Sequence, residues 1–422
     1  MTMAELRRRL YAARRGGVVL ELDRVRALMA ALGDPQRGYP VAHIGGTNGK
    51  GSTAVFVASI ARAAGARVGL YTSPHLSRFA ERFLVDGAEV DDDALLAAGA
   101  DVERAVEAMT DTPTFFERVT AIALVLFARA GVDLAVLEVG LGGRLDATNV
   151  VCADVAAVTG VAIEHTDYLG STLAEIAVEK AGIFKAGRRA VIGCSGEPEA
   201  VPLLRAAAER AEVASVRVVG EGEVAALAGV PLGIAGAMQR CNAACAMAVI
   251  DELEAAGVLT AGAAARRDGL AAARLPGRFE TVSTGPRVIV DGAHNPHAAR
   301  ALADTARAEG LPPVVLVLGL SRDKDAGAVA AALAPLARAA VATRARSDRA
   351  AAPSGVAAAL VAVRRDLPVE SRETSPAAID RARALAGPDG VVLVAGSLFL
   401  AGEAREHAGL AVADEDTLTD PL

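Results

Sequence analysis

Short apolar runs recur through the first half of the chain, and longer segments with apolar residues at helical spacing separate them. The runs cover residues 41–44, 68–71, 134–139 and 155–159. Short apolar strands that alternate with amphipathic helices are typical of a parallel sheet covered by helices. A longer helical stretch at residues 237–256 closes this half. The pattern therefore predicts an α/β fold.

The stretch 274-RLPGRFE-280 interrupts this alternation, because proline and glycine break regular elements. The pattern then restarts, with predicted strands and helices at residues 288–290, 296–309, 314–318, 326–337 and 391–394. We therefore predict two domains, residues 1–275 and 276–422, with a linker at about 275–285. The second domain is long enough to form a doubly wound, Rossmann-like unit.

The composition indicates a chain with a large core, since 52% of its 422 residues are hydrophobic and 23% are charged. A net charge of −7 argues against nucleic-acid or membrane-surface partners, which favour basic patches. The chain has no apolar run of transmembrane length, and its arginine-containing N-terminus lacks the apolar core of a secretory signal. We expect a cytoplasmic protein with a surface helix at its N-terminus, an organelle transit peptide being the alternative.

The four cysteines add no metal site. Cys152 and Cys194 stand alone, and Cys241 and Cys245 lie about one helical turn apart without a further Cys or His pair. We interpret all four as small core residues of a protein in a reducing compartment.

A glycine-rich stretch, 44-IGGTNGKGSTAVF-56, follows the first predicted strand and opens a helix. Glycines let the backbone approach a ligand closely, and the N–H groups at a helix N-terminus attract phosphate. Lys50 supplies a positive charge for the β- and γ-phosphates. Gly51 stands where the common phosphate loop has a Ser or Thr that binds Mg²⁺. The stretch predicts a nucleotide site whose metal is held by Ser52 or by other strands.

Candidate metal ligands lie at the ends of three other predicted strands. Ser73 follows the second apolar run, Glu138 lies at the end of the third, and His165 follows the fourth. The carboxyl ends of parallel strands meet at one edge of a sheet, so these side chains are expected beside the phosphates. Oxygen ligands with one imidazole suit Mg²⁺ or Mn²⁺.

Six motifs read, in chain order, GTNGKGS, YTSPHL, EVGLGGRLDATN, EKAGIFK, DGAHNP and GSLFLAGE. Together they resemble the folylpolyglutamate synthase/dihydrofolate synthase family of the Mur ligase superfamily, over almost the whole chain. The resemblance implies a Mur-type central domain with a phosphate loop, followed by a Rossmann-like C-terminal domain. It also implies an ATP-dependent amide ligase, in which ATP turns a carboxylate into an acyl phosphate and the amine of L-glutamate attacks it.

The resemblance assigns roles to individual residues. It implies ATP contacts from Thr47, Asn48, Gly49, Lys50, Gly51, Ser52, Asn242, Arg278 and Asp291, and Mg²⁺ ligands in Ser73, Glu138 and His165. Lys180 matches a lysine that is carbamylated, which would create an anion for a second metal. The implied catalytic residues are Lys50, Lys180 and His294, the last acting on the incoming amine or on the phosphate. Glu164 departs from the family pattern, which more usually has Asp before the metal-binding histidine.

A pterin site is also implied. Its residues would be Thr114, Phe115, Phe116, Glu117, Leu145, Asp146 and Ala147. Aromatic residues make up only 3% of the chain, and an aromatic ring can stack on a pterin. We expect one of the two phenylalanines to face the ligand and the other to belong to the core.

The sequence leaves the acceptor open, because 7,8-dihydropteroate, a reduced folate or both would use the same ATP and glutamate sites. The implied partners are these small molecules, and the implied state is a monomer. A peptidoglycan-type Mur ligase would have an extra N-terminal domain, for which the roughly 40 residues before the glycine loop are expected to be too few. A nucleotide-dependent switch is the other alternative; the DGAHNP motif and the second domain argue against it.

Overall fold

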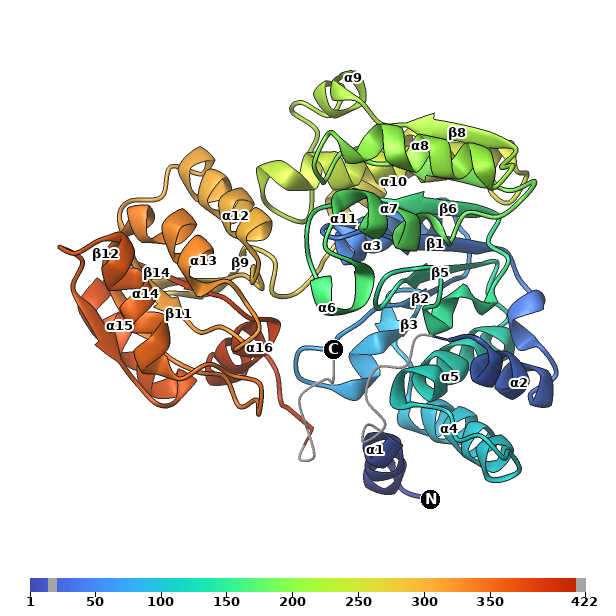
Figure 1. Ribbon diagram of the computed structural model, residues 1–422, viewed down its shortest axis with the longest axis horizontal. Helices are drawn as coiled ribbons and strands as arrows, with labels where there is room; N and C mark the ends of the chain where they lie inside the picture. Colours follow the sequence, from blue (N-terminus) through green and yellow to red (C-terminus); the bar gives the residue numbers. More distant parts are fainter. Residues whose placement is uncertain (14–20, 415–422) are drawn as a thin grey trace.

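The structure is a computed structural model that describes residues 1–13 and 21–414. These residues form two α/β domains that lie side by side (Figure 1). The predicted two-domain α/β class is therefore confirmed. The chain passes from the first sheet to the second between α11 (Ala263–Ala272) and β9 (Glu280–Thr284), through the predicted Pro-Gly break.

The N-terminal domain is built on an eight-stranded sheet, within the described residues, in the order β4-β3-β2-β5-β1-β6-β7-β8. Neighbouring strands run parallel from β2 to β8, and β3 and β4 form an antiparallel edge. The strands are β1 (Val41–Gly45), β2 (Val68–Tyr71), β3 (Phe83–Val85), β4 (Ala88–Glu89), β5 (Leu134–Glu138), β6 (Val155–Val158), β7 (Arg189–Ile192) and β8 (Ser215–Val218).

Helices cover both faces of this sheet. One face carries α1 (Met3–Ala12), α2 (Asp23–Ala31), α4 (Asp92–Glu107), α5 (Phe115–Ala130), α7 (Leu173–Ala181) and α8 (Ala200–Arg210). The other carries α3 (Lys50–Ala63), α10 (Ala237–Ala255) and α11. Short elements are η2 (Pro35–Arg37), η3 (Phe79–Arg82), η4 (Ala147–Val150), α6 (Thr166–Leu169) and α9 (Glu221–Ala225).

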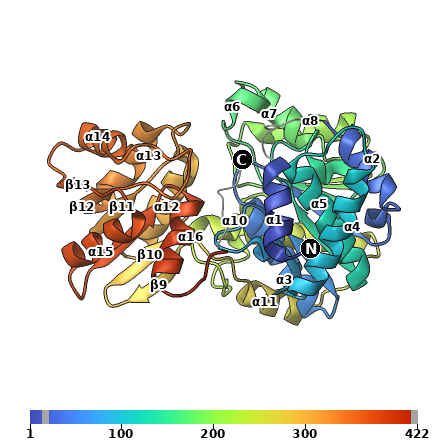
Figure 2. The ribbon, with the colours of Figure 1, turned by 90° about the horizontal axis from the view of Figure 1, so that it is seen from below.

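The C-terminal domain, seen beside the N-terminal domain in Figure 2, has a six-stranded sheet within the described residues. Its order is β13-β12-β11-β14-β10-β9, parallel except for β9. Its other strands are β10 (Arg287–Val290), β11 (Val314–Leu318), β12 (Ala337–Ala342), β13 (Val369–Ser371) and β14 (Val391–Ala395). Two apolar cores flank the sheet, one with α12 (Pro296–Ala308), α13 (Ala326–Leu333), η5 (Ala334–Leu336) and α14 (Pro353–Val363), the other with α15 (Ser375–Ala386) and α16 (Leu398–His407).

Strand β1 marks the place where a ligand is expected. The chain leaves β1 toward β2 on one side of the sheet, and later reaches β6 on the other side. In open α/β sheets, ligands bind beyond the carboxyl ends of the strands at such a switch point. The loop after β1 is the glycine-rich stretch. Among the described helices none combines the length and apolarity needed to cross a bilayer.

The N-terminal segment forms the expected helix, but α1 is anchored more firmly than a surface helix. Leu6 and Leu10 are fully buried, and Tyr11 is nearly so. These three side chains belong to the same apolar core as α4 and α5. The remaining arginines of this segment, at positions 14 and 15, lie outside the described residues.

A buried histidine on β1 makes the fold sensitive to acid. Burial, assisted by the charge of Lys185, lowers the pKa of His43 to about 3. An unfolded histidine takes up its proton near pH 6.5. Between these values the unfolded state binds more protons than the folded one, so stability falls as the pH falls.

We expect His43→Gln to flatten this fall by up to about 1.4 kcal/mol per pH unit, because glutamine does not titrate. Glutamine can also keep a hydrogen bond to Thr148, whose Oγ1 lies 2.8 Å from His43 Nε2. Urea unfolding of both proteins between about pH 7 and pH 4.5 measures the difference. Parallel pH profiles for the two proteins would contradict it.

Candidate active site

The glycine-rich loop between β1 and α3 is tied to the loop that follows β6. Thr47 N donates to Gly160 O at 2.8 Å, and Ala162 N donates to Thr47 Oγ1 at 3.0 Å. Thr159 Oγ1 donates to Asn48 O at 2.6 Å. Because β1 and β6 are parallel neighbours, these bonds join two strand ends and hold the loop in one shape.

Two glycines in this loop are required by close contacts. Gly46 has φ 137°, and a Cβ there would lie 2.0 Å from a threonine hydroxyl of the β6 loop. Gly49 has φ 84°, and a Cβ there would lie 2.1 Å from Asn242 Oδ1. Gly51 is different, since its Cβ would lie 3.3 Å from Glu138 Oε1. The position that carries a metal-binding hydroxyl in the common phosphate loop therefore faces a carboxylate.

Lys50 is the first residue of α3, and its Nζ donates back to Thr47 O at 3.0 Å. The ammonium group thus lies against its own loop, where the N-terminal end of α3 also attracts negative charge. The loop and Lys50 line one cavity. Together they form an anion site of the kind that binds nucleotide phosphates.

The predicted metal ligands line the same cavity. Ser73 N donates to Glu138 Oε2 at 3.0 Å, and Ser73 Oγ is buried without a hydrogen-bond partner. Burial raises the pKa of Glu138, against the nearby charge of Lys50. An unpartnered hydroxyl beside a buried carboxylate suits a hard cation. In the part of the chain that the structure describes, no group of three His, Cys, Asp or Glu side chains is arranged to hold a metal ion, so such a cation would need ligand or water oxygens as well.

His165 reaches this cavity from the loop after β6. It precedes α6 with φ 52°, a left-handed conformation that few non-glycine residues adopt. Burial lowers the pKa of His165 to about 4. The ring is therefore neutral at ordinary pH, which is the form that binds a metal ion.

Lys180 lies at the end of α7 and is almost fully buried. Its Nζ donates to Gly46 O at 3.0 Å, so Lys180 helps to hold the backbone of the glycine-rich loop in place. Burial and the charge of Lys50 lower the pKa of Lys180 to about 7. A substantial fraction of this amine is thus uncharged at neutral pH.

A second pocket shares loop residues 48, 49 and 52 with the first and includes residues of α10 and α12. Its lining contains the three predicted ATP residues that lie outside the phosphate loop, Asn242, Arg278 and Asp291. Ser195 Oγ donates to Asn242 Oδ1 at 2.7 Å. Arg278 and His294 line both pockets, so the two are continuous around the phosphate loop.

Asp291 fixes the backbone at the start of the C-terminal domain. Its Oδ2 accepts a hydrogen bond from Phe279 N at 2.9 Å, and its Oδ1 accepts one from Ala293 N at 2.8 Å. Burial raises the pKa of Asp291. The carboxylate therefore orders the backbone around Arg278 and His294 as well as lining the pocket.

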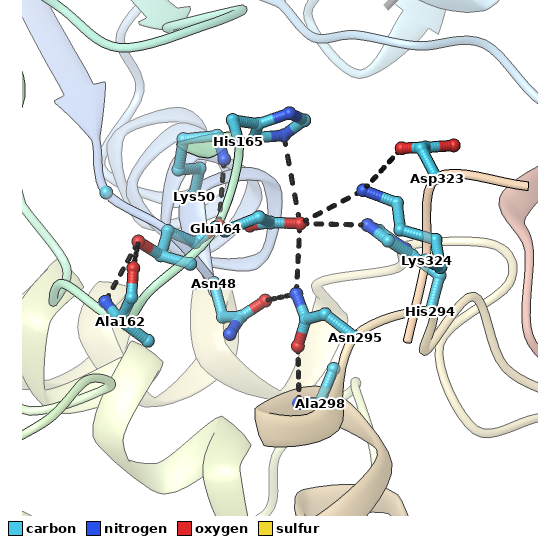
Figure 3. A network of polar contacts seen from close by, with 12 residues as sticks. Asn48, Lys50, Ala162, Glu164, His165, His294, Asn295, Ala298, Asp323 and Lys324 are labelled. Atoms are coloured by element: carbon cyan, nitrogen blue, oxygen red, sulfur yellow. Dashed lines mark hydrogen bonds and ion pairs between the residues drawn. The ribbon is translucent and has the colours of Figure 1, made fainter. Parts of the chain in front are cut away.

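Glu164 connects the two domains at the centre of the site (Figure 3). Its Oε1 accepts a hydrogen bond from Asn295 Nδ2 at 3.1 Å, and lies 3.4 Å from His294 Nε2 and 3.7 Å from Lys324 Nζ. Burial alone would raise the pKa of Glu164, but the hydrogen bond from His294 and the surrounding charges hold it well below its usual range. This side chain is therefore a carboxylate at any ordinary pH.

The C-terminal domain adds two cations that the sequence analysis missed, Lys324 and Arg349, which line the phosphate cavity. Lys324 Nζ lies 3.4 Å from Asp323 Oδ2, and Arg349 Nη2 lies 3.2 Å from the same oxygen. Lys324 follows β11 and Arg349 follows β12. The strand-end rule that pointed to Ser73 extends to Lys324, which follows the predicted strand at 314–318, but not to Arg349, because β12 was not predicted.

The residues predicted to bind pterin lie at the start of α5 and around η4. Thr114 and Glu117 form a reciprocal cap of α5, with Thr114 N donating to Glu117 Oε2 at 2.6 Å. Asp146 caps η4 and accepts a hydrogen bond from Leu141 N at 2.8 Å. Leu145 is partly buried and Ala147 is 6% exposed. These are structural roles, and binding by these residues stays a prediction.

The two phenylalanines differ. Phe115 is only 2% exposed and stacks on Tyr11, with 5.4 Å between the ring centroids, so it belongs to the apolar core. Phe116 is half-buried, and its ring lies against Gly140, where a Cβ would come within 2.4 Å of it. Gly140 lines the phosphate cavity. Phe116 is therefore the ring that borders the site.

The fold and the site are of the type found in the Mur ligase family. The family model for the Mur ligase middle domain matches residues 44–228, and the model for the Mur ligase glutamate ligase domain matches residues 277–398. The chain belongs to the folylpolyglutamate synthase/dihydrofolate synthase family, as the motifs predicted. A Mycobacterium tuberculosis dihydrofolate synthase/folylpolyglutamate synthase is 37% identical over 92% of this chain and 90% of its own length.

Other relatives are longer. A probable bifunctional folylpolyglutamate synthase/dihydropteroate synthase from Haloferax volcanii is 40% identical over 94% of this chain, and the chain spans 49% of its length.

Among solved structures, Mycobacterium tuberculosis folylpolyglutamate synthase complexed with ADP has a TM-score of 0.86 and 34% identity, covering 96% of this chain and 99% of that one. The Yersinia pestis bifunctional enzyme complexed with AMPPNP and a Mn ion has a TM-score of 0.85 and 31% identity, covering 97% and 98%.

Proposed function

We propose that this protein is an ATP-dependent amide ligase that adds L-glutamate to 7,8-dihydropteroate, to reduced folates, or to both. The observation that carries the proposal is a single cavity that is lined by residues of both domains. The N-terminal domain contributes the phosphate loop and Glu138, and the C-terminal domain contributes Lys324 and Arg349. A phosphate site that faces cations able to bind an anionic amine substrate suits ligation better than simple nucleotide hydrolysis. A nucleotide switch would not need the cations of the C-terminal domain.

The proposed reaction uses the two connected pockets in order. Asn242 and Asp291 would bind the adenosine side of ATP, with Arg278 reaching the phosphates and the γ-phosphate beside Lys50. A carboxylate oxygen of the pterin substrate attacks the γ-phosphorus, ADP leaves, and an acyl phosphate forms. Lys50 would neutralise charge on the transferred group, which is the main catalytic contribution in such transfers.

L-glutamate would then enter between the domains. Lys324 and Arg349 would bind its carboxylates. The free amine attacks the carbonyl carbon of the acyl phosphate, and phosphate leaves from the tetrahedral intermediate. His294 lines both pockets and is our candidate to receive the amine proton.

Ser73, Glu138 and His165 fit a divalent cation, for which we propose Mg²⁺, and a carbamylated Lys180 would provide a second site. When bound, such a cation neutralises charge on the β- and γ-phosphates. The Yersinia pestis relative complexed with AMPPNP and a Mn ion supports a divalent metal. We also expect a cytoplasmic monomer.

Phosphate release from ATP, with L-glutamate, Mg²⁺ and either 7,8-dihydropteroate or a reduced folate, tests the function. Release that requires dihydropteroate alone indicates a dedicated dihydrofolate synthase, and release with a reduced folate as well indicates a bifunctional enzyme. Release that ignores pterin and glutamate would contradict a ligase and indicate a nucleotide switch. Intact ATP binding without pterin-dependent release would indicate a Mur-type ligase with another acceptor.

Activity is expected to depend on carbon dioxide through Lys180. Only the uncharged amine forms a carbamate, and with a pKa of about 7 this form is depleted as the pH falls below 7. We expect Lys180→Gln to lose about 10- to 100-fold in activity, as loss of a metal-supporting group typically does. Carbon-13 NMR in labelled bicarbonate should show a carbamate signal in the native protein and in Lys185→Gln, but not in Lys180→Gln. A free Lys180 amine at saturating bicarbonate would overturn the assignment.

A further inference from the structure

One carboxylate of the N-terminal domain is the meeting point for three side chains of the C-terminal domain. Glu164 Oε1 lies 3.1 Å from Asn295 Nδ2, 3.4 Å from His294 Nε2 and 3.7 Å from Lys324 Nζ. Its side chain is only 9% exposed. Solvent therefore screens these attractions weakly, and they act over the gap between the domains (Figure 3).

Asn295 transmits this contact to a whole helix. It caps α12, because Ala298 N donates to Asn295 Oδ1 at 2.8 Å. With its oxygen used by the helix, the amide nitrogen is left for the other domain, where it contacts both Glu164 and Asn48 Oδ1, the latter at 3.2 Å. The same side chain thus joins α12, Glu164 and the phosphate loop.

Lys324 has carboxylates on two sides. Asp323 lies beside it in its own domain, with 3.4 Å between Oδ2 and Nζ, and Glu164 faces it from the other domain. Asp323 can balance the charge of Lys324 but cannot fix the distance of Lys324 from the phosphate loop. Glu164 can do both, because it belongs to the loop that follows β6 and borders the same cavity.

We infer that Glu164 is a positioning residue that holds the C-terminal domain closed on the phosphate loop and thereby places Lys324 and His294 for the amine substrate. The inference rests on the proposed function. Glu164 itself need not touch either substrate. Its loss should weaken use of L-glutamate much more than use of ATP, since the phosphate loop keeps its own bonds to residues 159–162.

The test compares Glu164→Gln with Asp323→Asn. Both substitutions remove one carboxylate from Lys324 and keep the side-chain shape, but only the first removes a charge across the domain interface. Asp323→Asn also removes the carboxylate beside Arg349, so within the C-terminal domain it is the larger loss of charge. For Glu164→Gln we expect the KM for L-glutamate to rise about tenfold or more, with the KM for ATP within about twofold of the native value. Asp323→Asn should raise the KM for L-glutamate by less than about threefold, and Glu164→Asp, which restores the charge, should recover part of the loss.

Coupling to Lys324 is measured in the same assay. If Glu164 acts through Lys324, the double variant Glu164→Gln/Lys324→Met should have a KM for L-glutamate close to that of Lys324→Met alone. Fully additive effects would overturn the inference, and so would equal effects of Glu164→Gln and Asp323→Asn, or equal effects on both substrates.

Small-angle scattering separates this inference from the proposed reaction, because it requires no turnover. With AMPPNP and Mg²⁺, we expect the native protein and Asp323→Asn to be more compact than Glu164→Gln. Equal radii of gyration would overturn the positioning role. If the native protein shows no glutamate-dependent phosphate release, the proposed function fails while the scattering result still tests the domain contact.

Discussion

Lys50→Met should lower kcat about a thousandfold without unfolding the protein. The ammonium group lies at the N-terminal end of α3, inside the cavity, and donates only to the carbonyl of Thr47 three residues earlier among the hydrogen bonds described for it. Removing it takes away a preorganised positive charge at the transferred phosphoryl group, and such losses cost about 10²- to 10³-fold in kcat. Phosphate release measured at saturating ATP and L-glutamate checks the result.

Lys185→Met is the matched control. Lys185 Nζ also donates to a carbonyl three residues earlier, that of Gly182 at 3.1 Å, but Lys185 is outside both pockets. It should retain activity close to that of the native protein. A Lys50→Met variant with near-native kcat, or equal losses in the two variants, would show that the loop does not direct phosphate transfer.

Glu138→Gln should lower activity about a hundredfold or more and yet leave the melting temperature unchanged or higher. The amide can still accept the hydrogen bond from Ser73 N, which is 3.0 Å from Glu138 Oε2. The negative charge needed by a divalent cation is lost, whereas burial of that charge, which raises the pKa of Glu138, no longer opposes folding. Activity as a function of Mg²⁺ concentration and thermal unfolding check both parts.

Glu103→Gln provides the opposite signature. Glu103 is also buried, but it is paired with Arg118 at 2.9 Å, away from both pockets. Removing one partner of a buried ion pair leaves the other uncompensated, and this typically costs about 3–5 kcal/mol. Glu103→Gln should therefore lose stability and keep its activity per folded molecule. A Glu138→Gln variant that behaved in this way would identify Glu138 as a structural residue.

The sequence pattern predicted most accurately the strands buried on both faces. The runs at 68–71 and 314–318 match β2 and β11, because strands covered by helices on both sides are continuously apolar. The edge strands β8 and β13 were not predicted, and neither were the inner strands β7 and β12. β8 alternates polar and apolar residues over only four positions, and β13 has three residues, two of them polar. So short a period-2 pattern cannot be distinguished from loop.

The site was predictable where one strand end specifies one residue. Ser73, Glu138 and Lys50 could be placed from the strand that precedes each, whereas the contacts of Glu164 depend on how the second domain sits against the first. No pattern along the chain predicts the distance between Glu164 and the side chains of the second domain. The same limit applies to Phe115 and Phe116, since adjacent positions on a helix point about 100° apart and only packing decides which one faces the core.

The bonds that tie Thr47 and Asn48 to the loop after β6 have a consequence for how a nucleotide is recognised. A loop that already has its bound shape gives up little conformational entropy when its ligand arrives. The entropy lost on forming the ternary complex should therefore come mainly from fixing the two domains relative to each other. Nucleotide binding can then be rapid and cost little conformational entropy. The slower ordering of the two domains then coincides with entry of the second substrate.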